Sequence, residues 1–293
     1  MNRPEKWLPG VTPQSKIRAV ARQALVARLK RVAKTLKRAE SGARNGADNI
    51  HKLRTWSRRS AAAVELFHPV LPNKEGIWFA RKLKQVRQAA GDVRDLDVML
   101  EQSADNPVLA KELRRRRDKA HRPLEKLHKR LITSGEFEKR QKRLLKKIDQ
   151  PKQRLGDWAA KRIAKQAATL VALGSQRLTT PAKAHEFRIA GKELRYVLEI
   201  IGAALPAAAV KVDAMLIDLQ QRIGIICDHA AAEKMYQQLL SQVSGSERLP
   251  LQAAIVQAKK EKTRCHKAFL RWWTSSRRIA FRRALIAAGL LQR

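Results

Sequence analysis

Two segments of the sequence repeat one pattern of side chains that suits anion binding. Each has a histidine, a base three residues later and another base seven residues later: His51, Arg54 and Arg58 in the first, and His185, Arg188 and Lys192 in the second. On a helix, this spacing places the three side chains on one face. Arginine can grip two phosphate oxygens at once, whereas lysine acts as a point charge. The pattern therefore predicts rows of cations that bind phosphate groups.

The remaining residues of both segments support amphipathic helices. The apolar side chains fall on the face opposite the cations: Leu53, Trp56, Ala63, Val64 and Phe67 in the first, and Phe187, Ala190, Leu194, Val197, Leu198 and Ile201 in the second. Like charges stacked on one helix face destabilise it, so a row of one sign favours an anionic partner. Arg195 extends the second row. Arg59, Arg81 and Lys84 are weaker candidates, near the first row or on the adjacent helix.

The two histidines have three interpretations. A metal site is disfavoured because neither His51 nor His185 has a second histidine or cysteine at ligand spacing on its helix. A phosphotransfer role would need an orienting carboxylate and a nucleotide site, and neither is evident. We expect each imidazole to donate to phosphate, more strongly when protonated. No cofactor, metal or catalytic residue is predicted.

Three aspartates follow these segments and raise the question of metal-assisted hydrolysis. Asp95 and Asp97 stand two residues apart, so on a helix they would not share a face, and Asp228 occurs in the second half. We expect them to cap helices or to pair with arginines of neighbouring helices.

Composition narrows the partner class. The 293 residues include 63 Lys+Arg and 26 Asp+Glu, a formal net charge of +37. Self-repulsion of this size is relieved most simply by an anionic partner, either nucleic acid, polyphosphate or an anionic membrane. The first ten residues lack the apolar segment of a signal peptide, and no apolar run is long enough to span a bilayer. We therefore expect a cytoplasmic protein without integral membrane association.

Helix-forming residues dominate, and strand signals are almost absent, which predicts an all-α fold of roughly nine to eleven helices. The predicted breaks between them include Gly42, Gly46, Asn106-Pro107, Gly174 and Pro206. The histidine pattern recurs after 134 residues, and Gly91-x-x-x-Asp95 recurs as Gly224-x-x-x-Asp228 after 133. The shared order and offset indicate that residues 13–290 form one domain made of two homologous repeats, about 13–150 and 151–290. Residues 1–12 are then an N-terminal extension.

These motifs resemble those of the CHAD family, the conserved histidine α-helical domain. Its pattern is a His-x-x-Arg-x-x-x-Arg/Lys helix followed by a Leu-Gly-x-x-Arg-Asp-x-Asp-Val segment, both repeated. Here residues 90–98 match the first such segment with alanine in place of leucine, and residues 219–228 match the second. The resemblance implies two helical bundles related by a pseudo-twofold axis around a basic groove or pore that binds inorganic polyphosphate, and an association with polyphosphate granules. The chain departs at Ala61 and Glu193, where the family pattern commonly has bases.

Three rival functions remain. The first is a non-specific nucleic-acid binder, since six tryptophans could stack on bases, although Trp56 and Trp273 suit a core better. The second is a metal-dependent polyphosphate hydrolase, but no phosphate-binding glycine loop or alternating-glutamate strand appears. The third is attachment to a membrane surface through 144–148 or 269–286. Polyphosphate binding without catalysis is the favoured function.

Overall fold

The computed structural model describes residues 6–40, 46–102, 107–242, 245 and 248–292, and all regular elements among them are helical. The predicted all-α class is confirmed, and the ten α-helices of the described ranges fall within the predicted number. Two predicted breaks, Gly42 and Asn106, lie outside the described residues. Gly174 is different, because it lies inside the last turn of a helix rather than between helices. It is buried there, and an added Cβ would lie 2.9 Å from the Phe187 ring.

The chain divides into two compact units. The N-terminal unit is Lys16–Lys152, and the C-terminal unit is Met1–Ser15 with Gln153–Arg293. The division falls close to the predicted repeat boundary at 150/151. That the two units are homologous repeats of one domain stays a prediction. The N-terminal extension belongs to the C-terminal unit, where Leu8 donates its backbone N–H to the Glu199 carbonyl at 2.9 Å and Trp7 packs against Gly202.

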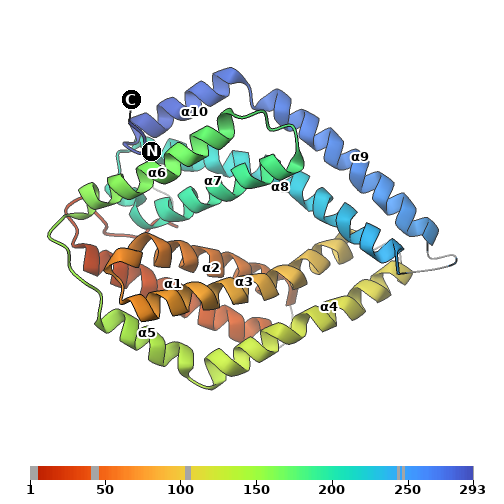
Figure 1. Ribbon diagram of the computed structural model, residues 1–293, viewed down its shortest axis with the longest axis horizontal. Helices are drawn as coiled ribbons and strands as arrows, with labels where there is room; N and C mark the ends of the chain where they lie inside the picture. Colours follow the sequence, from red (N-terminus) through yellow and green to blue (C-terminus); the bar gives the residue numbers. More distant parts are fainter. Residues whose placement is uncertain (1–5, 41–45, 103–106, 243–244, 246–247, 293) are drawn as a thin grey trace. The chain divides into compact units, whose positions relative to one another are not determined.

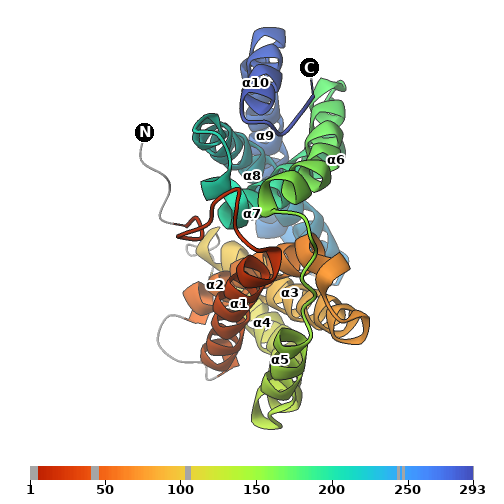
Figure 2. The ribbon, with the colours of Figure 1, turned by 90° about the vertical axis from the view of Figure 1, so that its left-hand side faces the viewer.

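The N-terminal unit is a helical bundle. Figure 2 shows its first four α-helices nearly end-on, and α1 packs against α2 and α4, as α3 does. Its elements in chain order are α1 (Ile17–Glu40), α2 (Gly46–Phe67), η1 (His68–Val70), α3 (Asn73–Gln102), α4 (Pro107–His128), the π-helical turn η2 (Lys129–Thr133) and α5 (Glu136–Lys146). The cation row predicted on 51–58 lies on α2, which packs side by side with α3 (Figure 1).

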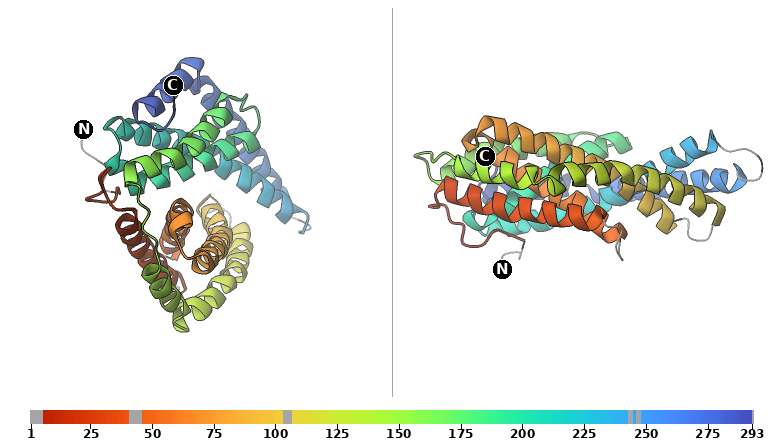
Figure 3. Two further views of the ribbon diagram at one scale, coloured as in Figure 1. Left: turned by 60° about the vertical axis from the view of Figure 1, so that its left-hand side comes forward. Right: turned by 90° about the horizontal axis from the view of Figure 1, so that it is seen from below.

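The C-terminal unit repeats the pairing of a histidine helix with the helix that follows it. Its elements are α6 (Leu155–Ser175), α7 (Pro181–Ile201), η3 (Gly202–Ala204), α8 (Ala208–Leu240), α9 (Arg248–Trp272) and α10 (Ser275–Ala287). Helix α7 begins at a proline and is capped by the Thr180 side chain, which accepts from the Lys183 N–H. It packs against α8, and α8 packs against α9 as an antiparallel pair (Figures 1 and 3).

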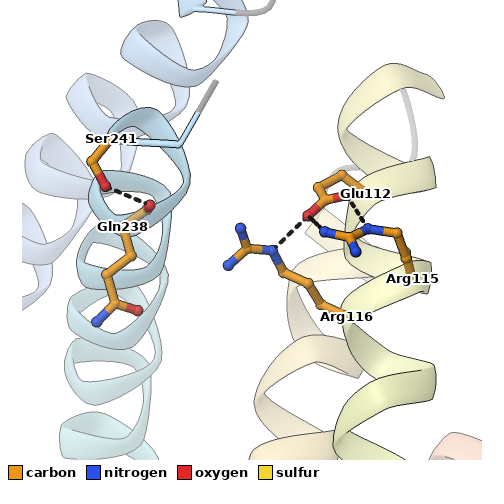
Figure 4. A network of polar contacts seen from close by, with 5 residues as sticks. All are labelled: Glu112, Arg115, Arg116, Gln238 and Ser241. Carbon is orange, nitrogen blue, oxygen red and sulfur yellow. Dashed lines mark hydrogen bonds and ion pairs between the residues drawn. The ribbon is translucent and has the colours of Figure 1, made fainter. Parts of the chain in front are cut away.

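The run Arg114–Arg117 on α4 is partly neutralised within its own unit. Glu112 accepts hydrogen bonds from Arg115 and Arg116, as Figure 4 shows. The Arg115 hydrogen bond is the largest of the effects that hold the pKa of Glu112 at about 2. Arg117 points elsewhere and pairs with buried Asp97 of α3, with 2.5 Å between Nε and Oδ1. The run is therefore not a patch of four unpaired cations.

Candidate functional site

In the N-terminal unit, Arg54 is the best-defined member of the predicted row. It reaches from α2 to α3, where its Nη1 lies 3.0 Å from Oδ1 of Asp95. The guanidinium passes over Gly91, since a Cβ added there would lie 3.9 Å from Nε. The Gly-x-x-x-Asp segment thus lies beside Arg54: the guanidinium is within van der Waals reach of Gly91, and the aspartate one turn later balances its charge.

The other candidates of this unit lie along the same pair of helices. His51 is exposed one turn before Arg54, and Arg58 is half-buried one turn after it. Arg59 lies over the ring of Trp56 at 4.8 Å. Arg81 and Lys84 are exposed on α3, on the face that carries Gly91 and Asp95, because these positions are spaced three, four or seven residues apart. The cation row of α2 therefore continues onto α3.

The C-terminal unit places Arg188 as the N-terminal unit places Arg54. Arg188 reaches from α7 across Gly224 of α8, where an added Cβ would lie 3.4 Å from Nη2 and 3.7 Å from Nε. The two arginines differ in whether a carboxylate pairs with them. Asp228, the counterpart of Asp95, forms no ion pair with Arg188 in the described part of the chain, and the buried Nε of Arg188 has no hydrogen-bond partner there. A buried donor of this kind is costly unless a partner is supplied.

His185 lies against α8 through a cysteine. Its Nδ1 is 3.4 Å from Sγ of Cys227. Burial raises the pKa of the Cys227 thiol, although the nearby charges of Arg188 and Lys192 oppose this. The thiol therefore stays protonated near neutral pH and can donate to Nδ1, which places the proton of a neutral imidazole on Nε2. Lys192, the last member of the predicted row, is half-buried one turn after Arg188.

Arg195 occupies a different environment from the other predicted residues. Its Nη1 donates to Gln220 at 2.6 Å, its Nε lies 3.7 Å from Asp213, and its Nη2 lies 3.8 Å from Glu199. All three partners are buried. The predicted contact of Arg195 with phosphate stays a prediction, while the geometry ties its charge to two internal carboxylates.

The aspartates near the first row behave as predicted. Asp95 pairs with Arg54 of α2, and Asp97 pairs with Arg117 of α4. The two side chains thus point to different helices, as their spacing required. Asp228 is exposed in the middle of α8, and no ion pair joins it to another described residue, so the prediction was wrong for this aspartate. The confirmed pairing of Asp95 and Asp97 with arginines gives these carboxylates a structural role.

Sequence reasoning missed a second group of cations in the N-terminal unit. An open cavity of about 400 Å³ between α3 and the end of α4 is lined by Asp92, Lys126 and Arg130, among others. Nearby, burial and the charges of Arg130 and Arg81 lower the pKa of Lys82. Cations crowded in this way favour a bound anion. No local sequence pattern indicates this group, because α3 and η2 meet only in the folded unit.

The tryptophans divide into two groups. Trp7, Trp78, Trp158 and Trp273 are buried, and the prediction that Trp273 belongs to the core is confirmed. Trp56, which was predicted to suit the core, is only half-buried, and Arg31 and Arg59 lie over its ring. Trp272 is half-buried too, with Arg222 and Arg277 over its ring. Guanidinium groups thus occupy stacking positions on both rings, which disfavours their use as platforms for bases. Among the described helices, none has the length and apolarity that a bilayer crossing requires.

An all-helical chain whose histidine helices each carry an arginine across the glycine of the next helix defines a class of domain. The family model "CHAD domain" matches residues 27–237, and this chain belongs to that family. No curated protein matches it in sequence.

Several solved structures share its fold, and two of them are described below. The CHAD domain of the plant Ricinus communis is 18% identical, with a TM-score of 0.69, and 94% of each chain is covered. PptA from Streptomyces chartreusis is 15% identical, with a TM-score of 0.66, covering 88% of this chain and 99% of that one.

Proposed function

We propose that this chain binds inorganic polyphosphate through the cation rows of α2–α3 and α7–α8 and performs no chemistry on it. Polyphosphate is a flexible chain with about one negative charge per repeat and no bases, so it is best held by cations at short, regular intervals. Membership of the CHAD family and the net charge of +37 support the proposal. The observation that carries it is Arg188, whose buried Nε lacks a partner beside half-buried Lys192 and exposed His185.

Binding without catalysis is favoured by how the nearby carboxylates are used. A hydrolase needs acidic groups that hold a metal or activate water. Asp95 and Asp97 are each committed to an arginine. Incubation with polyphosphate and Mg²⁺ or Mn²⁺ should release no orthophosphate, and sustained release would overturn this part of the proposal.

The direct test of binding is a titration of the full chain with long-chain polyphosphate at several salt concentrations. Neutralising each phosphate charge releases counterions, so the affinity should fall steeply and linearly on a log–log plot against salt. An affinity that is weak at low salt, or that does not change with salt, would contradict the proposal.

Asp95 competes with phosphate for Arg54, which makes it a site where affinity can be increased. The Asp95→Asn variant removes a carboxylate that is 44% exposed and 3.0 Å from the guanidinium. An exposed pair is worth at most about 1 kcal/mol, so we expect polyphosphate to bind about 2- to 5-fold more tightly. Equilibrium titration measures the change.

The matched control is Asp118→Asn on α4, which makes the same change in net charge at another exposed position. It should alter the affinity by less than about 2-fold. Equal gains in the two variants would show that total charge, rather than the Arg54–Asp95 pair, sets the affinity.

The family resemblance adds two further parts to the proposal. One is that the two rows are related by a pseudo-twofold axis and serve one polyphosphate chain in a shared groove. The other is that the protein acts in the cytoplasm, at polyphosphate granules. The first part predicts one long polyphosphate chain per protein chain, and two independent sites of equal affinity would contradict it.

A further inference from the structure

We propose that His229, Glu261 and Cys265 form a binding site for a single divalent transition-metal ion, with Zn²⁺ the best match. The site is separate from the cation rows and does not depend on the polyphosphate proposal. His229 comes from α8, and Glu261 and Cys265 come from α9. One ligand atom of each residue lies within 4.8 Å of the other two.

The arrangement follows from how α8 and α9 pack. Glu261 and Cys265 are four residues apart, so both side chains lie on one face of α9. His229 meets this face from α8, which packs along α9 as an antiparallel partner (Figure 3). All three side chains are half-buried. An ion held here would therefore join the two helices and keep one coordination position open to water.

The ligand types select the metal. Thiolate and imidazole favour zinc over calcium or magnesium, which prefer oxygen ligands alone. Zinc bonds of 2.0–2.3 Å place neighbouring ligand atoms about 3.3–3.8 Å apart in a tetrahedron. The three ligand atoms lie within 4.8 Å of one another. To bind zinc they must therefore approach one another by about 1 Å, and small changes of side-chain torsion angles can bring this about.

The surrounding charges permit a cation despite the basic chain. Arg264 donates to Glu261 at 2.6 Å, so a cation already lies beside this carboxylate. A metal ion in place of the guanidinium would keep the charge of the carboxylate balanced. The Arg264 side chain is 69% exposed, so it can turn into solvent when an ion takes its place. A thiolate at Cys265 would supply the second negative charge.

Titration of the reduced full-length chain with Co²⁺, a spectroscopic stand-in for Zn²⁺, tests the proposal. We expect one Co²⁺ per chain, with intense visible bands of tetrahedral geometry and a sulfur-to-cobalt charge-transfer band. One equivalent of Zn²⁺ should displace Co²⁺ and so remove the visible bands and the charge-transfer band. Absence of the charge-transfer band in the wild type would overturn the proposal.

Variants assign the ligands. Cys265→Ser should abolish the charge-transfer band and weaken Zn²⁺ binding at least about 100-fold, since loss of even an outer partner costs 10- to 100-fold. Glu261→Gln should weaken binding but keep the band, because the sulfur ligand remains.

The control is Cys227→Ser, which removes the other cysteine of the chain, two residues from His229 and beside His185. This variant should bind Co²⁺ as the wild type does. If the band were lost in Cys227→Ser and kept in Cys265→Ser, the metal would lie at Cys227 and the proposed site would be wrong. Far-UV circular dichroism checks that every variant is folded.

Discussion

Replacing Arg54 and Arg188 together with alanine is expected to weaken polyphosphate binding about 100-fold. Each arginine lies across the glycine of the neighbouring helix and can make charge-assisted hydrogen bonds with phosphate. Such bonds contribute about 1.5–3 kcal/mol each, so the loss of two corresponds to roughly 3 kcal/mol or more. The slope of log affinity against log salt should also become shallower by about 1.5, since two contacts are lost. Titration at several salt concentrations gives both numbers.

The control for this variant is the double replacement of Arg282 and Arg283, which are exposed on α10. It removes the same charge from a helix that carries no part of the proposed rows, so the affinity should fall by less than about 3-fold. Equal losses in both double variants would mean that the chain attracts polyphosphate through its overall charge alone.

The single variants separate the two arginines. Arg54 already has Asp95 as a partner, whereas the Nε of Arg188 has none among the described residues. Phosphate gains more at Arg188, because it does not have to replace a carboxylate there. Arg188→Ala should therefore account for the larger share of the loss.

Arg195→Ala should reduce stability rather than binding. The substitution leaves Asp213 and Glu199 buried without their cation, and breaking a buried pair in this way costs about 3–5 kcal/mol. Urea unfolding measures the loss. Arg222→Ala is the matched control, because Arg222 pairs with half-exposed Asp218 in the same unit, and we expect a loss of only about 1 kcal/mol.

The dependence of this effect on pH identifies its cause. Burial raises the pKa of Asp213 above 3.8, and Arg195 opposes the increase, so the variant should have a still higher value. A carboxyl group with a raised pKa binds more protons in the folded than in the unfolded state, which stabilises the fold as the pH falls. The deficit of Arg195→Ala should therefore shrink towards pH 3.8, and Asp213→Asn should partly correct it. A deficit that is constant with pH would exclude the unpaired carboxylate as its cause.

The predicted repeats allow Arg195 to be compared with the corresponding position of the N-terminal unit. At the offset of 134 residues its counterpart is Ala61, and at the offset of 133 the counterpart of Asp213 is Ala80. Arg195 and Asp213 are thus present together in one unit and absent together in the other, whereas Glu199 has Glu65 as its counterpart at the offset of 134.

Local patterns predicted the helices, the faces of α2 and α7 and the pairing of the aspartates. Leu53, Val64 and Phe67 are buried, as the helical period required. Asp95 and Asp97 bind arginines of two different helices, as their spacing indicated. These features depend on periodicity within one segment, which the sequence displays directly.

Features that depend on tertiary contacts were not predictable in the same way. The helical period places Arg195 on the same face of α7 as the other cations. The sequence around Arg195 does not identify its partners, Gln220 and Asp213, because both lie on α8. Trp56 lies on the apolar side of α2, yet Arg31 of α1 covers its ring at 5.6 Å. The group of His229, Glu261 and Cys265 likewise exists only because α8 and α9 pack together.

Competition between polyanions tests the central claim most directly. Labelled long-chain polyphosphate bound to the wild-type chain is challenged with unlabelled polyphosphate or with duplex DNA at the same phosphate concentration. If the cation rows are suited to a flexible chain of bare phosphates, unlabelled polyphosphate should displace the labelled chain. Duplex DNA should leave most of the labelled chain bound. Displacement by DNA as effective as that by polyphosphate would contradict the account and indicate a general nucleic-acid binder.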